Sequence, residues 1–374
     1  MGTTMNSILV PLDGSPLAEQ SLPYAASLAR RSGARVILVR AAQAHTLLDV
    51  DAGTAQIAAM QRAEQDLEAV ATRLYSEGVK AEVHVYYDHP LPAILDAAGR
   101  HKVGLIVMAT HGRSGLGRMV YGSVADDVLR HADVPVLLVP ATIDHAWPLD
   151  RPLTVLVPLD GSALAEDALS SAELLADLPG VRLHLLRVVE PPRYPLYGDG
   201  YAYVPFDDAA ERGAARAYLD ELAGRLSDAG RQVSIEVAVG LPSAVVPRVA
   251  NESQADVIAM ATHGRGGLAR LVLGSVATGT LQRAHVPLLL TRPAALDRPL
   301  PVPPSAIPET TGAPAITLSL TTSELGLVRQ AVESLLVASS GEEHVSAPLR
   351  SILDRMRAAQ QDAASAERDV VGAT

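Results

Sequence analysis

Six residues, Met-Ala-Thr-His-Gly-Arg, occur twice in the chain, at positions 108–113 and again at positions 260–265. The two copies lie 152 residues apart. In both copies nine residues separate the glycine of the motif from a Gly-Ser-Val-Ala stretch, which stands at 122–125 and at 274–277. A spaced set of residues that recurs as a whole indicates tandem duplication of one domain.

A second duplicated motif, Val-Pro-Leu-Asp-Gly-Ser, stands far upstream of the first, at 10–15 and at 157–162. Its copies lie 147 residues apart. Both motifs place small residues where a strand should end and a helix begin, and α/β sheets bind phosphate groups at such points. The sequence therefore predicts two copies of a domain that is suited to phosphate binding.

Length and composition limit the class of protein. A chain of 374 residues allows two or three domains of roughly 100–200 residues each. The lack of cysteine excludes disulfides, thiolate metal sites and cysteine nucleophiles. The net charge of −11 argues against general binding of nucleic acid. We find neither a signal peptide nor an apolar run long enough for a membrane helix, so we expect a cytoplasmic protein without a membrane partner.

Apolar periodicity predicts alternating strands and helices in both halves. Ser15 is expected to cap a helix with Pro16 in its first turn. The other predicted helices of the first half are 54–77, 91–101 and 123–131. The predicted strands are 7–12, 35–41, 82–87, 104–110 and 134–139, followed in the second half by 154–159, 182–189, 234–239, 257–262 and 286–290.

This alternation implies an α/β fold in which each half is a five-stranded parallel sheet with helices on both faces. If the first strand lies beside the fourth, right-handed crossovers give the strand order 3-2-1-4-5. The two duplicated motifs follow those two strands and would meet at one crevice. The polar and apolar alternation in 82–87 is typical of an edge strand, whereas the continuous apolar run 104–110 indicates a buried one.

The same pattern divides the chain into two domains and three further segments. We expect the first domain over 1–142 and the second over 153–292, with 143–152 as the linker between them. Residues 293–315 form a proline-rich linker, and 316–374 read as a small helical tail of unknown function.

One stretch of the second half stands apart from the repeat. Residues 190–206 hold four of the ten tyrosines and the only phenylalanine, and their proline and glycine content predicts no regular structure. Two interpretations are open, a surface loop or domain contact, and a lid over a second ligand site.

The motifs carry groups that suit a nucleotide. Gly112 would let the backbone approach a ligand, and Gly122 with Ser123 would open a helix whose free amides face phosphates. Arg113 and Arg118 could add positive charge, and Asp13 could accept a ribose hydroxyl. The corresponding residues of the second half are Gly264, Gly274, Ser275, Arg265, Arg270 and Asp160.

Other nucleotide-binding motifs and the hydrolase motif do not match this sequence. The glycine spacing from Gly112 resembles a P-loop, but Arg118 and Met119 replace its lysine and its serine or threonine. The dinucleotide motif is absent after the first strand, and so is the nucleophile motif of α/β-hydrolases. No carboxylate or nucleophile stands at a spacing from His111 or His263 that would indicate a catalytic site. This favours a turn-stabilising or solvent-facing role for the two histidines over catalysis.

The paired motifs resemble those of the universal stress protein family, in its ATP-binding subclass. That family's signature, Gly-x-x-Gly-x(9)-Gly-(Ser/Thr), corresponds to Ala109 through Gly112 to Gly122-Ser123, and to Ala261 through Gly264 to Gly274-Ser275. The resemblance covers about residues 5–292. One departure is common to both copies, since Ala109 and Ala261 replace the first glycine, and a requirement for φ > 0 there would cost about 1 kcal/mol or more.

The resemblance implies ATP as the ligand, with any Mg²⁺ carried by the nucleotide. It also implies pairing of the two halves through their fifth strands as an intrachain pseudo-dimer, and a homodimer of the whole chain remains open. The first-strand stretches with Pro11 and Pro158 resemble the family's opening strand, and Asp13 and Asp160 its adenosine-contacting aspartate. The backbone of Ala41 and Val188 would contact adenine.

We therefore expect a nucleotide-binding regulatory protein that holds ATP without fast turnover and is not an enzyme. Two alternatives are a slow ATPase or self-phosphorylating protein that uses Ser123 or Ser275, and a scaffold whose pockets hold no nucleotide.

Overall fold

The protein is described by a computed structural model. The residues that it describes are 5–42, 52–110, 122–141, 143, 147, 151–191, 193–195, 201–203, 208–262 and 273–292. The predicted linker 293–315 and tail 316–374 lie outside the described residues, as do eight motif residues, His111, Gly112, Arg113, Arg118, His263, Gly264, Arg265 and Arg270.

The first repeat alternates strands and helices as predicted, with one difference. The helix expected after Ser15 is two helices, because Pro23 has no N–H and fits only the first turn of the second one. Ser15 caps the first of them, and its Oγ accepts from the Ala18 N–H at 3.2 Å. The elements are β1 (Ser7–Pro11), α1 (Pro16–Glu19), α2 (Leu22–Ser32), β2 (Arg35–Ala41), α3 (Ala52–Ser76), β3 (Ala81–Tyr86), α4 (Pro90–Arg100), β4 (Leu105–Ala109), α5 (Ser123–His131) and β5 (Val136–Val139).

The second repeat has the same order of elements, except that one helix replaces α1 and α2 and a small hairpin is added, so the prediction that 190–206 has no regular structure was wrong. Its strands β8 (Arg193–Pro195) and β9 (Tyr201–Tyr203) pair antiparallel. Tyrosine favours strands, and proline is tolerated in an edge strand because no neighbour needs its missing N–H. The other elements are β6 (Leu153–Leu159), α6 (Ala163–Ala176), β7 (Val181–Val189), α7 (Ala209–Asp228), β10 (Gln232–Val239), α8 (Pro242–Glu252), β11 (Val257–Ala261), α9 (Ser275–Leu281) and β12 (Leu288–Thr291).

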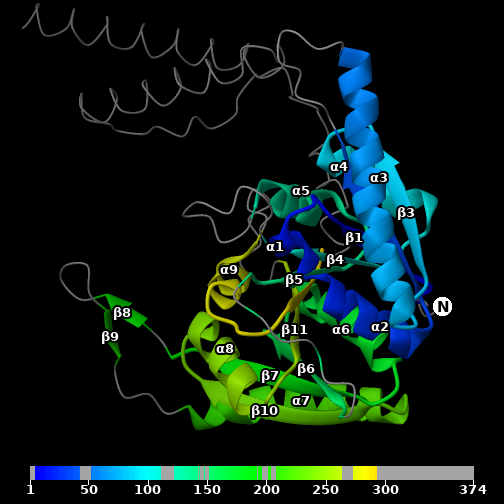
Figure 1. Ribbon diagram of the computed structural model, residues 1–374. Coiled ribbons are helices and arrows are strands. Elements are labelled where there is room, and N and C mark those ends of the chain that lie inside the picture. Colours follow the sequence, from blue (N-terminus) through cyan, green and yellow to red (C-terminus); the bar gives the residue numbers. More distant parts are fainter. Residues whose placement is uncertain are drawn as a thin grey trace, which may run out of the picture. The chain divides into compact units, whose positions relative to one another are not determined.

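All strands other than the hairpin join one ten-stranded sheet, in the order β10-β7-β6-β11-β12-β5-β4-β1-β2-β3. Each half is parallel and has the order 3-2-1-4-5, with its first strand beside its fourth. The half-exposed strands β3 and β10 form the two edges, at opposite ends of the sheet in Figure 1.

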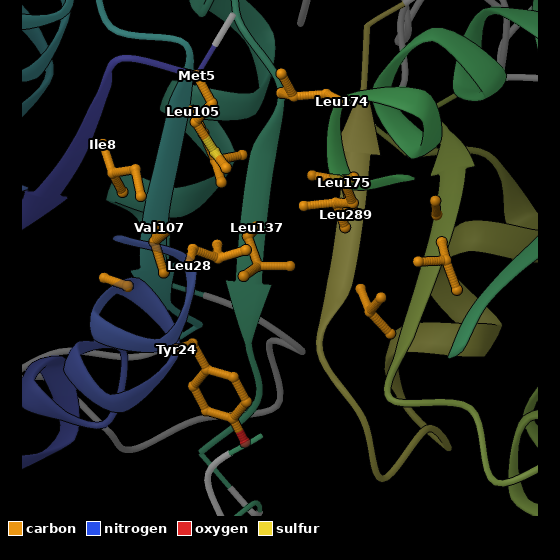
Figure 2. Packing of buried hydrophobic residues seen from close by; sticks show 14 of the residues in the cluster. Met5, Ile8, Tyr24, Leu28, Leu105, Val107, Leu137, Leu174, Leu175 and Leu289 are labelled. Atoms are coloured by element: carbon orange, nitrogen blue, oxygen red, sulfur yellow. The ribbon is translucent and has the colours of Figure 1, made fainter. Parts of the chain in front are cut away.

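The halves join through their fifth strands, as the family resemblance implied. β5 and β12 pair antiparallel, with Leu137 opposite Leu289 at the centre of the ladder. Figure 2 shows these two leucines on neighbouring strands, with Leu175 of α6 beside Leu289. The pairing covers two apolar edges that would otherwise be open to association with other chains.

Helices cover both faces of the sheet and form two apolar layers. Because strand side chains alternate, Ile8 and Val10 of β1 pack into one layer and Leu9 into the other. The first layer contains α2, α3, α6 and α7, and the second contains α4, α5, α8 and α9. Both layers run across the two repeats, so each layer is shared by the two repeats.

The linker between the repeats makes side-chain contacts with both of them. Trp147 is buried and meets the ring of Tyr24 edge-on, at a centroid distance of 5.3 Å. Its Nε1 donates to the carbonyl oxygen of Asp256 at 2.8 Å. Arg151 donates to both carboxylate oxygens of Asp256, at 2.7 and 2.9 Å. The linker therefore contacts α2 of the first repeat and the start of β11 in the second.

None of the helices in the described part of the chain is long and apolar enough to cross a membrane.

Candidate functional site

A pocket of about 910 Å³ opens at the carboxyl ends of β6, β7 and β11 in the second repeat. Every predicted site residue of this repeat that the structure describes lines it. These residues are Pro158, Asp160, Val188, Ala261, Gly274 and Ser275. They come from four separate elements, so the fold brings the duplicated motifs together at one place.

Asp160 is held in a fixed position at the end of β6. Its Oδ1 accepts from the backbone N–H of Ser162 at 2.9 Å and from the hydroxyl of Ser162 at 2.5 Å. Gly161 between them has φ +76°, a conformation that other residues rarely adopt. The turn thus holds Asp160 in the pocket lining, while Ser162 caps α6 by accepting from Ala165 N–H at 3.2 Å.

Gly274 is the N-cap residue of α9, and Ser275 is the first residue of that helix. The Gly274 N–H donates to the carbonyl oxygen of Thr262 at 2.7 Å, which ties the helix start to the end of β11. Its φ of −61° and ψ of 161° are open to any residue. The backbone conformation therefore does not require a glycine here.

Gly122 repeats this arrangement at the start of α5, with φ −70° and ψ 159°. Its N–H donates to the carbonyl oxygen of Thr110 at 2.5 Å. The two helix starts are thus built alike in both repeats.

The alanines that replace the first signature glycine are accommodated without strain. Ala109 and Ala261 are the last residues of β4 and β11 and have strand conformations. Among the described residues, positive φ outside glycine occurs at Lys102 and Gln254 and not at either alanine. The energetic cost of a positive φ at alanine therefore does not arise at these two positions.

The pocket also contains charged and aromatic groups that sequence reasoning missed, above all Arg187 and Tyr218. Arg187 donates to the Leu159 carbonyl oxygen at 3.2 Å, and the Tyr218 hydroxyl donates to Glu166 at 2.9 Å. Burial, followed by the hydrogen bond to Glu166, raises the pKa of Tyr218. A signal existed for the arginine, because Arg40 and Arg187 stand just before the predicted adenine contacts Ala41 and Val188 in both repeats.

The first repeat has a smaller pocket, of about 550 Å³. Two predicted residues, Asp13 and Ala41, line it together with Arg40, Asp66 and other residues of α3. The remaining predicted residues that the structure describes are not in its lining; these are Pro11, Ala109, Gly122 and Ser123. The two repeats therefore differ in how completely they gather the motif residues.

An ion pair occupies the first pocket. Arg40 Nη1 lies 2.7 Å from Asp66 Oδ2, and the arginine side chain is 12% exposed. Its guanidinium packs so closely over Gly14 that a Cβ there would lie 2.8 Å from it. The buried residues of α3 and α7 recur at the same spacing along the two helices. When the helices are aligned on these residues, Tyr218 of α7 takes the place of Asp66 of α3. At this position the second repeat has a tyrosine where the first has the carboxylate that pairs with Arg40.

Known proteins similar to this chain agree with the duplicated architecture. A universal stress protein of Mycobacterium tuberculosis is 29% identical over 240 residues, covering 61% of this chain and 76% of the relative. One of Synechocystis sp. is 24% identical over 318 residues, which are 77% of this chain and all of the relative. The crystal structure of a universal stress protein from Archaeoglobus fulgidus has a TM-score of 0.60 at 23% identity, covering 78% of this chain and 99% of that one.

The family model matches two segments that correspond to the two halves of the sheet. The universal stress protein family model covers residues 5–140 and again residues 153–292. The chain therefore belongs to the universal stress protein family, as a tandem member with two copies of its domain.

Proposed function

We propose that the protein is an adenine-nucleotide-binding regulator of the stress response, which holds ATP without fast turnover. Membership of the universal stress protein family supports the role in the stress response. The observation that carries the nucleotide proposal is the pocket of the second repeat, where six residues chosen from sequence motifs meet.

The chemistry of that pocket suits the three parts of a nucleotide. Asp160 would accept hydrogen bonds from the ribose, since its carboxylate is held at the pocket by Ser162. The backbone of Val188 and the apolar side chains of Val246 and Met260 would surround adenine. The amides behind Gly274 would face the phosphates, because the first turn of a helix has free N–H groups and a positive dipole end.

The pocket volume agrees with this assignment. About 910 Å³ lies within the roughly 300–1,000 Å³ that small-molecule sites usually occupy. In the proposal any Mg²⁺ arrives with the ATP, and its ligands are mainly phosphate oxygens and water.

We expect the second repeat to bind more tightly than the first. In the first repeat the Arg40–Asp66 ion pair lies in the smaller pocket, which gathers only two of the predicted residues, so a bound nucleotide would have to accommodate that pair. Two sites of unequal affinity are therefore expected in calorimetry of the full chain.

The proposal is tested by replacing Gly274 with valine. The branched side chain would fill the space in front of α9, and hydrogen bonds to charged groups are worth about 1.5–3 kcal/mol each, so a loss of a few kcal/mol is expected. Gly122→Val should remove the weaker site, and the double variant should bind no ATP. Because both glycines have ordinary φ values, the fold should persist, which circular dichroism checks.

A matched control is Gly213→Val on α7, where a Cβ meets nothing within 4 Å. Near-normal ATP affinity in the double glycine variant would contradict the phosphate position. Release of inorganic phosphate from ATP, measured in the same preparations, separates a holding protein from a slow ATPase; turnover within minutes would favour the enzyme.

A further inference from the structure

Three potential metal ligands converge at the outer edge of the first repeat. Glu82 and His84 of β3 and His101, which follows α4, each offer a ligand atom, and these atoms all lie within 4.8 Å of one another. We propose that Glu82, His84 and His101 bind a divalent transition-metal ion, with Zn²⁺ as the best-suited metal.

Local structure brings the three side chains together. Glu82 and His84 are two residues apart on β3, so both side chains point to the same face of the sheet. Helix α4 covers this face and ends at His101, whose N–H donates to the Ala97 carbonyl oxygen at 3.0 Å. The two imidazole rings lie 4.3 Å apart between centroids, at an angle of 47°.

The polar atoms of this cluster are only partly satisfied. His84 Nε2 is buried and has no hydrogen-bond partner within the described part of the chain. Glu82 Oε2 lies 3.9 Å from it, which is too long for a hydrogen bond. The other oxygen, Glu82 Oε1, is held by Arg35 at 2.8 Å, so the carboxylate is fixed with its free oxygen toward His84. A cation between these atoms would satisfy both of them.

The donor set favours zinc. Two imidazoles and one carboxylate are a known three-ligand set for Zn²⁺, which leaves a fourth position for water. Bonds of about 2.0–2.2 Å require the three side chains to close slightly on the ion.

The cluster is separate from the nucleotide pockets. Glu82 is near the amino end of β3, whereas the pockets lie at the carboxyl ends of the strands. Pro90 at the start of α4 lines the first pocket, and His101 follows the other end of this 11-residue helix. At about 1.5 Å per residue, the helix separates the two by about 16 Å.

The second repeat provides an internal comparison. At the offset of 152 residues, Ser234, Glu236 and Ser253 take the places of Glu82, His84 and His101. Among the described residues, the histidine on this face is His184, which is bonded through Nδ1 to Ser234 at 2.8 Å and through Nε2 to Glu236 at 3.1 Å. With a single imidazole and both of its nitrogens engaged, this face should not bind zinc tightly.

Zinc titration of the full chain tests the proposal. Calorimetry with ZnCl₂, on nucleotide-free protein without an affinity tag, should show one tight site. Loss of a residue that only supports a metal ligand lowers metal affinity roughly 10–100-fold. Loss of a direct ligand should cost at least as much, so His84→Gln and His101→Gln should each weaken zinc binding by at least this factor. His184→Gln, on the matching face of the second repeat, should leave zinc affinity unchanged.

Co²⁺ supplies a second readout that does not depend on affinity. The wild-type protein should give the visible absorption bands of a four-coordinate cobalt site, and both cluster variants should lose them. Because His101 follows the end of its helix, His101→Gln should fold normally even if the change at His84 does not. Zinc affinity and cobalt spectra that are the same in wild type and His101→Gln would overturn the proposal, as would an equal loss in His184→Gln.

Discussion

Arg40 and Arg187 occupy matching positions at the ends of β2 and β7, yet they have different partners. Arg40 is paired with the carboxylate of Asp66, whereas Arg187 donates to the Leu159 carbonyl oxygen. One position on the covering helix also differs, being Asp66 in α3 and Tyr218 in α7. The two pockets thus differ chemically at this position.

We expect Asp66→Asn to strengthen ATP binding by the first repeat. The change removes a negative charge from the pocket that an anionic nucleotide would enter, which should be worth about 1 kcal/mol, or about a threefold to tenfold gain in affinity. The measurement is calorimetry in a Gly274→Val background, so that only the first site contributes. Asp220→Asn, which breaks an exposed pair with Arg216 on α7, is the control and should change nothing. An unchanged or weaker first site would show that the Arg40–Asp66 pair does not limit binding.

The short connection between the repeats acts as a structural element in its own right. Trp147 packs on Tyr24 of α2 and donates to the backbone before β11, so one side chain contacts both halves. Arg151 adds a paired contact to Asp256, whose carboxylate is 6% exposed. These contacts join the repeats on one face of the sheet, in addition to the strand pairing.

We expect Trp147→Ala to destabilise the whole protein by about 3–5 kcal/mol, the usual cost of removing a buried large aromatic side chain. Trp147→Phe keeps most of the packing and loses the hydrogen bond to Asp256, so a cost of about 1 kcal/mol is expected. Urea unfolding followed by circular dichroism measures both, since Trp147 is the only tryptophan and its fluorescence is lost. Equally small effects of the two changes would show that the linker merely covers the surface.

The whole molecule is organised around the central β5–β12 pair. Its leucines are fully buried, and the same apolar layers extend across both repeats. Separating the repeats would therefore expose a strand edge and apolar surface at once.

We expect residues 1–142 and 153–292, when expressed separately, to self-associate or aggregate, because each would have an open fifth strand. When mixed, they should form a one-to-one complex in analytical ultracentrifugation. Two well-behaved monomers that ignore each other would contradict the inferred role of the strand pairing.

We also expect a chain that ends at Arg292 to retain full ATP affinity, since both signature copies precede this residue. The truncation keeps the contact of Arg292 Nη1 with the Arg130 carbonyl oxygen at 2.9 Å. Calorimetry of truncated and full-length protein should give the same Kd values. A normally folded truncation with weakened binding would place part of the site in the tail.

Much of the architecture could be predicted from the sequence, for reasons that are local. Apolar periodicity located the strands; β2 begins and ends where the pattern predicted, and so does α5. Turn chemistry located the helix starts at Ser15 and Gly274, because caps depend on a few adjacent residues. Parallel strands end at one edge of a sheet, so the motif positions also predicted residues that line the pocket of the second repeat.

Other features depend on side chains that are distant in sequence and meet only after packing. The Arg40–Asp66 pair, the Trp147 contact with Asp256 and the cluster of Glu82, His84 and His101 each join different elements. Periodicity shows which face of a helix is buried. It does not show which polar groups of other elements come within bonding distance of that helix. The sequence by itself thus determined the repeats, the fold and the motif positions. Tertiary packing alone decided the inequality of the two pockets and the histidine cluster.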